Sequence, residues 1–559
     1  MDLPEAYYLL HFETLVEDAC GRYGDLLRPE ERNRVEAYRG LPRGSRCLLV
    51  RMLLRRGPWF PEQSLRYAEV GDPAPFLVQL VTAGFCLGPD EAPLEALLPL
   101  LTRQDLARHL AALGIAHPRS AKRGDLEALL RTQEGLLERL RGELRPVSLA
   151  QEGLWTLLAF LFFGNFEQDL SSFVVAELGH VRYADYAVDP EARLFQSRED
   201  VDFLLSIRDL KEELGTHPEA LPRITEAALA LAPHPGIRQQ RRYQGLLNEL
   251  GRAWERLGDN TSALACYSRS ERPPARERRV RVMAAQGRLE EALSLALELA
   301  EGPLDQGEAR FARIFLHRHH RQCPAAQAWL ETHRAPDPPV ERRIVLEHPP
   351  LGRVEEAALE AARAEGWEGF FAENHLWRAL FGLVFWDELF APVPGAFQHR
   401  FQNAPLDIQG FYEPRQKDIE ARLTELTGGG SPLRLILGNA DRHWGTACRF
   451  LSWKHLDRAD LCAAVTRIPP ALLARVLGTM ARNPLAFDSG FPDLFLYRPG
   501  DEAWSLWEIK GPGDALRPEQ AWWLEQFRAA GASAWVVRVD WKKPVASRPA
   551  FLDTSFGYP

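Results

Sequence analysis

The C-terminal third of the chain carries a pattern of apolar and polar positions that predicts a β-hairpin, followed by a helix and another strand. Two apolar, aromatic-rich runs, at 490–497 and 504–511, flank a polar turn and are bounded by Gly and Pro. An amphipathic segment at 518–530 predicts a helix, and the apolar run at 534–539 predicts a further strand. This order of elements is typical of an α/β core.

Most of the preceding chain carries helical patterns instead. Residues 354–364 predict one helix, and a second is expected from about Glu373 to 388, where the residues are apolar nearly all round and must be buried. Another helical run is predicted from 457 to 482, directly before the hairpin. A Pro-rich stretch at 335–340 predicts a linker that separates these helices from the region before it.

A weak internal repeat precedes that linker. Gly258 and Gly287 are each followed five residues later by an Ala-Leu pair. Tetratricopeptide (TPR) repeats are helix-turn-helix units of about 34 residues, so we predict two shortened or divergent units of that type. The arginine-rich stretch between the two copies includes Arg276, Arg278 and Arg279, which are predicted to contact DNA phosphates. The alternative is a solvated helix face.

Residues 1–90 are predicted to form a helical DNA-binding region. Arg51, Arg55 and Arg56 cluster on or near one side of an apolar helical segment. A grip on the phosphate backbone and a core helix with solvated arginines explain this cluster equally well.

Two short helices are predicted between about residues 101 and 130. Thr102 suits the N-cap of the first helix and Gly114 its C-terminal cap, and the second helix begins near Lys122. Two short helices joined by a basic turn resemble a SAP domain, a small DNA-binding module, with Lys122 and Arg123 as the predicted DNA contacts. A helical hairpin without that function is the alternative.

Length, charge and cysteine content indicate a multidomain protein of the cytosol. At 559 residues the chain is too long for one hydrophobic core, so several domains are expected. Its formal net charge of −9 gives no global signal for nucleic acid, although a local groove could still be basic. Seven cysteines, an odd number without a C-x-x-C pair, favour reduced thiols in the cytosol. The acidic segment 1–17 does not fit a signal peptide, and no apolar run reaches the ~18–20 residues of a membrane span.

The hairpin carries three charged residues that suit phosphodiester chemistry. Asp493 begins the first strand, and Glu508 and Lys510, two apart on the second, project from the same face. Carboxylate oxygens are the ligands that Mg²⁺ and Mn²⁺ prefer, and a lysine beside them can hold the attacking water or a developing charge. This is the PD-(D/E)xK pattern of metal-dependent nucleases, with fourteen residues between Asp493 and Glu508. A solvated surface hairpin is the alternative, but the apolar strand around Glu508 makes an unpaired charge there unfavourable.

The chain resembles the Fanconi-associated nuclease family, whose C-terminal domain is the virus-type replication-repair nuclease (VRR-NUC) module. The resemblance is carried by residues 55–60, 380–387, 405–407, 490–494 and 507–514, and by Gln520 with Trp523-Leu524. The order of an N-terminal region, a SAP-like hairpin, repeats and a nuclease domain is also similar. The chain has no Cys/His set for the zinc-finger ubiquitin-binding module of animal members, which is typical of a bacterial homologue.

The resemblance implies a metal site and assigns roles within it. One or two Mg²⁺ or Mn²⁺ ions would be bound by Glu373, Asp493, Glu508 and the carbonyl of Ile509. Lys510 would orient or deprotonate the nucleophile, and Gln520 would position it or support the metal shell.

The acid on the helix before the hairpin has two candidates. Glu373 matches the family's acid and lies at the mouth of the helix, where an ion could reach it. Glu388, just after the Trp386-Asp387 pair, is the alternative, although an acid beside the core there could simply cap the helix.

We therefore expect a multidomain protein with a mostly α-helical N-terminal part and a C-terminal α/β PD-(D/E)xK nuclease domain. The expected segments are an N-terminal helical DNA-binding region at 1–90, a SAP-like helical domain at 91–235, TPR-like repeats at 236–340, and a VRR-NUC domain with its helical lead-in at 341–559. The resemblance implies a metal-dependent, structure-specific DNA hydrolase of phosphodiesterase I type. It would act as a 5′-flap endonuclease and 5′–3′ exonuclease in DNA repair, including interstrand crosslink repair.

The expected partner is branched or flapped double-stranded DNA, bound by a soluble monomer in the bacterial cytoplasm, at the nucleoid, and without a membrane. A non-catalytic repair scaffold is one rival, but such a protein is expected to have lost Asp493, Glu508 or Lys510, and all three are present. A Holliday-junction or restriction-type nuclease is the other. Those enzymes usually cut as dimers of a compact domain, whereas this chain has a large helical N-terminal part.

Overall fold

Contacts within the chain divide it into two compact units. The computed structural model describes residues 6–55, 57–133, 135–150, 152–177, 181–189, 191, 193–333, 339–346 and 352–542. Unit 1 comprises Met1–Glu199 together with Pro394–Gln402, and unit 2 comprises Asp200–Val393 with Asn403–Pro559. The boundary after Glu199 lies inside the segment expected at 91–235.

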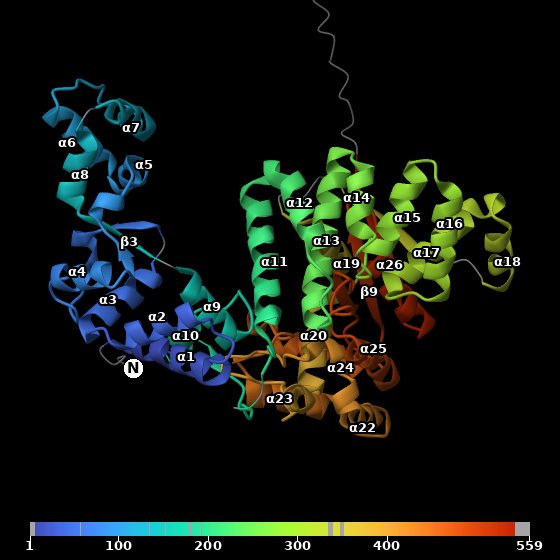
Figure 1. Cartoon of the computed structure of the whole chain (residues 1–559). Coiled ribbons are helices and arrows are strands. Elements are labelled where there is room, and N and C mark those ends of the chain that lie inside the picture. The colour runs from blue at the N-terminus through green and yellow to red at the C-terminus, as the bar shows by residue number, and fades with distance from the viewer. Residues whose placement is uncertain are drawn as a thin grey trace, which may run out of the picture. The chain divides into compact units, whose positions relative to one another are not determined.

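Unit 1 is mostly helical and holds one small sheet. Figure 1 labels its helices, which are α1 (Tyr7–Tyr23), α2 (Pro29–Arg39), α3 (Arg43–Leu53), α4 (Ala74–Thr82), α5 (Leu94–Leu97), α6 (Arg103–Ala112), α7 (Arg123–Arg131), α8 (Leu136–Leu144), α9 (Glu152–Phe163) and α10 (Ser171–Glu177). Strands β1 (Trp59–Pro61), β3 (Pro146–Leu149) and β2 (Cys86–Leu87) pair antiparallel in the order β1-β3-β2, and β4 (Arg182–Tyr183) follows α10.

The two short helices predicted near residues 101–130 are α6 and α7. The Thr102 hydroxyl accepts a hydrogen bond from the backbone N–H of Asp105, which is the predicted N-cap. Gly114 has φ 72° just after α6, and Lys122 directly precedes α7. Both helices contribute buried leucines to one core cluster, Leu106, Leu110, Leu126 and Leu130. The helical hairpin is confirmed, and its DNA-binding role stays a prediction.

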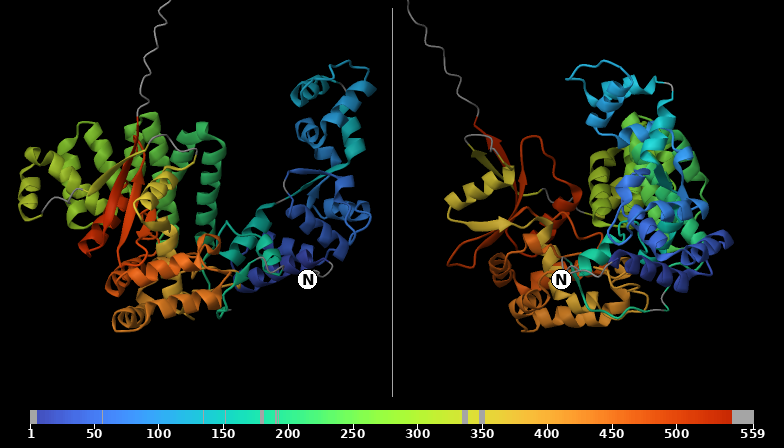
Figure 2. Two further views of the ribbon diagram at one scale, coloured as in Figure 1. Left: turned by 180° about the vertical axis from the view of Figure 1, so that it is seen from behind. Right: turned by 90° about the vertical axis from the view of Figure 1, so that its left-hand side faces the viewer.

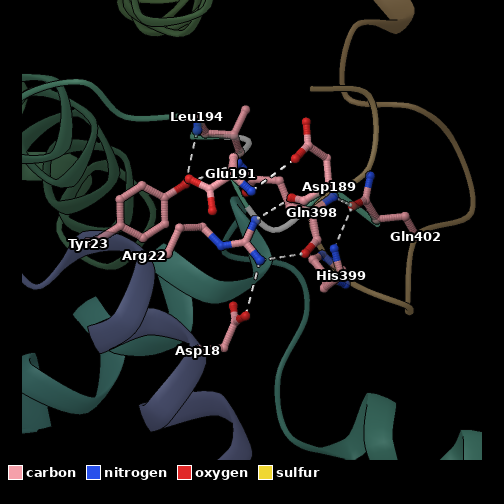
Figure 3. Close-up of polar contacts among 9 residues, drawn as sticks. All are labelled: Asp18, Arg22, Tyr23, Asp189, Glu191, Leu194, Gln398, His399 and Gln402. Atoms are coloured by element: carbon pink, nitrogen blue, oxygen red, sulfur yellow. Dashed lines mark hydrogen bonds and ion pairs between the residues drawn. The ribbon is translucent and has the colours of Figure 1, made fainter. Parts of the chain in front are cut away.

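A short segment from the C-terminal half of the chain, Pro394–Gln402, completes unit 1 (Figure 3). The fully buried Tyr23 hydroxyl accepts hydrogen bonds from the backbone N–H of Leu194 at 2.9 Å and from the Gln398 side chain at 3.0 Å. Arg22 donates to the backbone carbonyls of Asp189 and Gln398 at 3.2 and 3.1 Å. These bonds satisfy polar groups that burial would otherwise leave without partners.

His399 fixes the same segment from within the core. Burial lowers the pKa of His399 to about 4, so the imidazole is neutral. Its Nδ1 accepts from the backbone N–H of Phe401, and its Nε2 therefore donates to the carbonyl of Phe163 at 3.3 Å. The segment is thus held as part of the unit 1 core and does not lie on its surface.

Unit 2 begins with helices that pair in sequence order, seen in green to yellow-green in Figure 1. They are α11 (Arg198–Thr216), α12 (Leu221–Ala230), α13 (Ile237–Leu257), α14 (Asn260–Tyr267), α15 (Ala275–Ala285), α16 (Leu289–Glu301), α17 (Gln306–His319) and α18 (Pro324–Thr332). Gly258 and Gly287 have φ 81° and 78° where α13 and α15 end. The repeat therefore marks two turns between paired helices, because glycine adopts this left-handed conformation without strain.

A second group of helices leads into the sheet of unit 2. It comprises α19 (Val354–Ala364), α20 (Glu373–Val384), α21 (Trp386–Leu389), α22 (Gln416–Thr427), α23 (Pro432–His443), α24 (Arg458–Arg467) and α25 (Pro470–Arg482), with a two-residue strand β7 (Thr446–Ala447). The predicted bounds of α19 and the predicted start of α20 are confirmed. The single helical run predicted from 457 to 482 is wrong, because Pro469 and Pro470 separate α24 from α25.

No single helix among the described residues has the length and apolar composition that crossing a membrane requires. Helices α24 and α25 reach that length and apolar composition only together, and they are bent by 110° to each other. Their apolar side chains, among them Leu461, Leu473 and Val476, are buried within the protein.

The sheet of unit 2 has five strands in the order β5-β10-β9-β8-β6. They are β5 (Glu341–Leu346), β6 (Glu368–Phe371), β8 (Leu494–Tyr497), β9 (Trp504–Lys510) and β10 (Ala534–Trp541), with α26 (Pro518–Ala529) between β9 and β10. β8 and β9 form the predicted antiparallel hairpin, and β10 pairs parallel to β9. The edge strands β5 and β6 were not predicted, since neither contains a fully buried apolar run like those of the hairpin.

The two faces of this sheet carry different chemistry. Helix α19 covers one face, where Leu359 packs into a cluster with Trp507 and Ile509; Figure 2 shows α19 in yellow beside the red strands. Because side chains alternate along a strand, Glu508 and Lys510 point to the other face. Helix α26 lies there, since its Gln520 donates a hydrogen bond to Glu508.

The Tyr23 hydroxyl provides a test of the docked segment. Tyr23→Phe should destabilise unit 1 locally by about 1–3 kcal/mol, because two buried donors lose their acceptor. Hydrogen–deuterium exchange of α1 and of Pro394–Gln402 should accelerate together. Tyr67→Phe is the matched control, since that hydroxyl accepts only from the exposed Arg55 among the bonds described, and its exchange should match wild type. Unchanged exchange in Tyr23→Phe would contradict the assigned role.

Candidate active site

Asp493 joins three elements at the end of the hairpin. Its carboxylate Oδ2 accepts a hydrogen bond from the backbone N–H of Ile509 on β9 at 2.7 Å. Its backbone carbonyl accepts from the N–H groups of Ala372 and Glu373 at 2.8 and 3.2 Å. The start of α20 is therefore fixed to the start of β8, and Glu373 is brought beside Asp493.

Glu373 stands in an unusual backbone conformation. Its φ is 33°, in the left-handed region that residues with side chains rarely adopt. Such strain persists where surrounding contacts impose it, and it often accompanies function. The backbone N–H of this strained residue donates a hydrogen bond to the Asp493 carbonyl.

Glu508 is the most buried charged group of the site, with 1% of its surface exposed. Its Oε1 accepts from the Lys510 ammonium at 2.6 Å and from the Gln520 amide. Its Oε2 is buried and has no hydrogen-bond partner among the described residues. Burial, together with repulsion from Asp493, raises the pKa of Glu508 to about 8, although Lys510 opposes the shift.

The pKa of Asp493 is raised as well, to about 6. Burial is the main cause, and the carboxylates of Glu355 and Glu373 add repulsion, while the Ile509 N–H and Lys510 oppose it. Glu355 lies in the first turn of α19 and was not predicted from the sequence. Nothing in its local pattern sets it apart from the other acids of that helix, since only the folded chain brings it near Asp493.

The segment before Asp493 approaches α26 closely. Gly490 has φ 87°, and a Cβ on it would lie 3.0 Å from the backbone of Glu519. Phe491 then stacks on Trp523 of α26, with 4.3 Å between the ring centroids. Glycine is required at this position, and the contact sets the distance between Asp493 and Gln520.

These residues fit a divalent cation that prefers oxygen ligands. Among the described residues, no three His, Cys, Asp or Glu side chains are already placed to hold an ion. The Oε2 of Glu508 nevertheless lacks a partner among the described residues, and burial, together with repulsion from neighbouring carboxylates, raises the pKa values of both carboxyl groups. A cation between Asp493 and Glu508 would compensate that charge and supply the missing partner.

Glu388 is held elsewhere. It lies on α21, is 5% exposed, and forms an ion pair with Arg422, whose Nε is 3.1 Å from its Oε1. Of the two alternatives predicted for the acid before the hairpin, the structure brings Glu373 to Asp493.

The arginines predicted to grip DNA near the N-terminus have partners within the chain. Arg51 forms an ion pair with Glu69 at 2.6 Å and lies over the Tyr8 ring. Arg55 donates to the backbone carbonyl of Ser64, and Arg56 lies outside the described residues. DNA contact by this group stays a prediction.

The remaining predicted contacts are divided between both units. In unit 1 Arg123 pairs with Glu127, and the preceding Lys122 is exposed. In unit 2 Arg276 and Arg278 lie 3.5 and 3.4 Å from the carboxylates of Glu308 and Glu255, and Arg279 is half-buried. Their contact with DNA also stays a prediction.

A basic pocket of about 550 Å³ lies beside α26, between α15 and α17. Arg281, Arg310 and Arg318 contribute cations to its wall, and Phe311 and Phe315 contribute rings. Arg310 also forms an ion pair with Glu525 at 2.9 Å, which joins α17 to α26. Arg281 belongs to the arginine-rich stretch that the sequence indicated, whereas Arg310 and Arg318 of α17 were not predicted, because only packing brings α17 beside Arg281.

Comparison with known proteins places this arrangement in a family. Two family models match, "FAN1, HTH domain" over residues 6–87 and "VRR-NUC domain" over residues 430–541. A Fanconi-associated nuclease 1 homolog from Arabidopsis thaliana is 26% identical over 95% of this chain and 67% of its own length. A crystal structure of paFAN1 bound to 2-nt 5′-flap DNA with a gap covers 98% of this chain and 100% of its own, at 29% identity and a TM-score of 0.85.

A Fanconi-associated nuclease 1 homolog from Pseudomonas aeruginosa is 31% identical over 553 residues, which cover 96% of this chain and 97% of that protein. Similarity of this extent includes the hairpin, the helix that carries Glu373 and the repeat helices. The chain belongs to the Fanconi-associated nuclease family.

Proposed function

We propose that the protein is a metal-dependent nuclease that hydrolyses phosphodiester bonds in 5′-flap DNA. The observation that carries the proposal is Glu508, which has one oxygen held by Lys510 and Gln520 and the other buried without a partner beside Asp493. The relative paFAN1, crystallised with 5′-flap DNA, supports the choice of substrate. Endonuclease and 5′–3′ exonuclease action, and a role in interstrand crosslink repair, belong to the same proposal.

Glu373, Asp493, Glu508 and the carbonyl of Ile509 would hold one or two Mg²⁺ or Mn²⁺ ions. Such an ion, when bound, lowers the pKa of a water ligand and stabilises the leaving oxygen. Hydrogen bonds within the protein hold Asp493 in place. The bond from the Ile509 N–H fixes the Asp493 carboxylate, and the bonds from Ala372 and Glu373 fix its backbone.

Lys510 and Gln520 hold the shared carboxylate and complete the site. The Lys510 ammonium compensates the charge of Glu508 at Oε1, so that Oε2 alone is left for an ion. The same ammonium would donate to the attacking water or to the phosphate oxygens. Gln520 keeps Glu508 in one orientation, which limits the movement of the reacting groups.

The basic pocket beside α26 would hold the substrate backbone close to these acids. Arg281 and Arg318 are exposed there and would reach phosphates, although the Nε of Arg281 also pairs with Glu277 of the same helix at 2.8 Å. Arg310 is less exposed and pairs with Glu525. Phe311 and Phe315 are almost fully buried in the adjoining core, and the Arg281 guanidinium lies 4.5 Å from the centroid of the Phe311 ring. A local basic pocket of this kind allows DNA binding by a chain with a net charge of −9.

A non-catalytic scaffold is the alternative from another class. The raised pKa values of Asp493 and Glu508 weigh against it, because a purely structural site has no need to keep two repelling carboxyl groups buried together. A Holliday-junction or restriction-type nuclease would share the acids and is separated from the proposal by its substrate. Cleavage assays with flap, junction and plain duplex DNA distinguish the three.

The acids provide the first test of catalysis. Asp493→Asn, Glu508→Gln and Glu373→Gln should each lower 5′-flap cleavage by at least about 100-fold, since loss of a ligand's outer partner alone costs 10–100-fold. Flap affinity in Ca²⁺, measured by fluorescence anisotropy, should stay close to wild type. Glu388→Gln is the matched control and should keep its cleavage rate. Near-normal Mg²⁺-dependent cleavage by Asp493→Asn would refute the proposal that Asp493 is a metal ligand.

The pH dependence of metal binding provides a second test. Ion binding must displace protons from Asp493 and Glu508, whose pKa values are about 6 and about 8 in the free protein. Mn²⁺ affinity should therefore rise with pH up to about 8, by up to tenfold per pH unit and per group. Calorimetry in buffers of different ionisation enthalpy should detect the released protons at pH 7. In Glu508→Gln the dependence near pH 8 should disappear, and a pH-independent affinity in wild type would contradict the site.

The basic pocket provides a third test. Replacing both Arg281 and Arg318 with Gln should weaken binding to all flap sequences alike. The slope of log affinity against log salt should flatten by about 0.7–0.9 per lost phosphate contact. Arg498→Gln, at the opposite end of β8, is the control and should leave both quantities unchanged. A salt slope identical to wild type in the double variant would show that the pocket does not contact phosphates.

A further inference from the structure

A second pocket of unit 2 is acidic and has no part in the proposed catalysis. It has a volume of about 370 Å³ and lies between α21 and α22. Four carboxylates and one guanidinium line it: Asp387, Glu388, Asp418, Glu425 and Arg422. The formal excess of negative charge predisposes this pocket to bind a cation.

Glu388 is the residue that points to a ligand. It is 5% exposed, and its Oε1 accepts from Arg422 at 3.1 Å. Its Oε2 is buried and lacks a hydrogen-bond partner within the described part of the chain. A buried carboxylate oxygen without a donor is unfavourable, and native proteins rarely leave one. Burial also raises the pKa of Glu388, as expected for a carboxyl group whose charge is poorly compensated.

Arg422 offers too few donors for the carboxylates of this pocket. Its Nε donates to Glu388, its Nη2 donates to Asp387 at 3.1 Å, and its Nη1 donates to Glu425 at 3.0 Å. One guanidinium is thus divided among three carboxylates, and Asp418 faces the same pocket from α22. The pocket therefore still offers carboxylate oxygens that could accept hydrogen bonds from a ligand's N–H groups.

The backbone that carries Glu388 is fixed before any ligand arrives. The buried Arg415 donates to the backbone carbonyl of Glu388 at 2.8 Å. Asp407 holds the Arg415 guanidinium through two bonds, at 2.7 and 3.1 Å. A preorganised carboxylate loses less freedom on binding, which favours a specific site over a diffuse acidic surface.

The spacing of the acids selects the class of ligand. The carboxylates around this pocket are held apart, because Arg422 lies between Glu388, Asp387 and Glu425 and binds all three. The volume of the pocket is far larger than one ion requires, and its charge repels a DNA backbone. A cation with several N–H donors can reach separated carboxylates, as ammonium and guanidinium groups do.

We propose that this pocket binds an organic cation through Glu388 and Asp418, with an alkylammonium or guanidinium group seated against the buried carboxylate. The cation is supplied either by a free polyamine or by a Lys or Arg side chain of a basic peptide. The site is independent of the catalytic acids, since none of Glu373, Asp493 and Glu508 lines it.

Calorimetric titration of the full-length chain tests the proposal. The probes are spermidine, a blocked tripeptide with a central arginine, and MgCl₂ alone. Glu388→Gln keeps the shape of the side chain and should weaken binding of the organic cation by at least about tenfold. Asp418→Asn, at an exposed position, should weaken it measurably as well. Glu502→Gln in the β8–β9 turn is the matched control and should bind as wild type does.

The outcomes distinguish a free polyamine from a protein side chain, and an organic cation from Mg²⁺. Tighter binding of spermidine identifies a free polyamine, and tighter binding of the tripeptide identifies a protein side chain; both support the site. Equal affinity in all four proteins, or no binding of either organic cation, overturns it. Binding of Mg²⁺ that competes with spermidine and is lost in both pocket variants overturns the ligand class. Thermal melting checks the fold of Glu388→Gln, and Asp418→Asn decides the question if that variant unfolds.

Discussion

The structure of the nuclease-like unit depends on the hydrogen bonds around Asp493. The Asp493 carboxylate accepts a hydrogen bond from the backbone of β9, and its backbone carbonyl accepts from the N–H groups at the start of α20. The hairpin is thereby joined to a helix that begins more than a hundred residues earlier in the chain. The strained backbone of Glu373 and the close approach of Gly490 to α26 lie beside that junction.

Burial at this junction has an electrostatic consequence. Glu508 and Asp493 are withdrawn from water within reach of each other, and Lys510 compensates only part of their charge. The protein therefore stores unfavourable electrostatic energy in a place where a cation can relieve it. The same principle applies at Glu388, where Arg422 satisfies one carboxylate oxygen and leaves the other without a partner. Chemically similar acids thus face different surroundings, with Lys510 and Gln520 around Glu508 and Arg422 around Glu388.

Arginines in this chain differ in how much of each guanidinium is used inside the protein. Arg415 and Arg22 are structural, since they bind carboxylates or backbone carbonyls inside a core. Arg281 and Arg318 instead line an accessible pocket beside α26. An arginine cluster in sequence does not distinguish these uses, because a guanidinium that is already divided among internal acceptors has few donors left for a phosphate.

The sequence by itself determined the hairpin, its Asp493–Glu508–Lys510 set and the bounds of α19, because these follow from local alternation and helical periodicity, which record which face of an element is buried. The family resemblance added Glu373 and Gln520 as candidates for the same site. Only the tertiary structure brought Glu373 and not Glu388 to Asp493, added Glu355, formed the basic pocket from α15 and α17, and placed Pro394–Gln402 in unit 1. These outcomes depend on contacts between residues far apart in the chain, and local pattern carries no information on which distant partner satisfies a buried polar group.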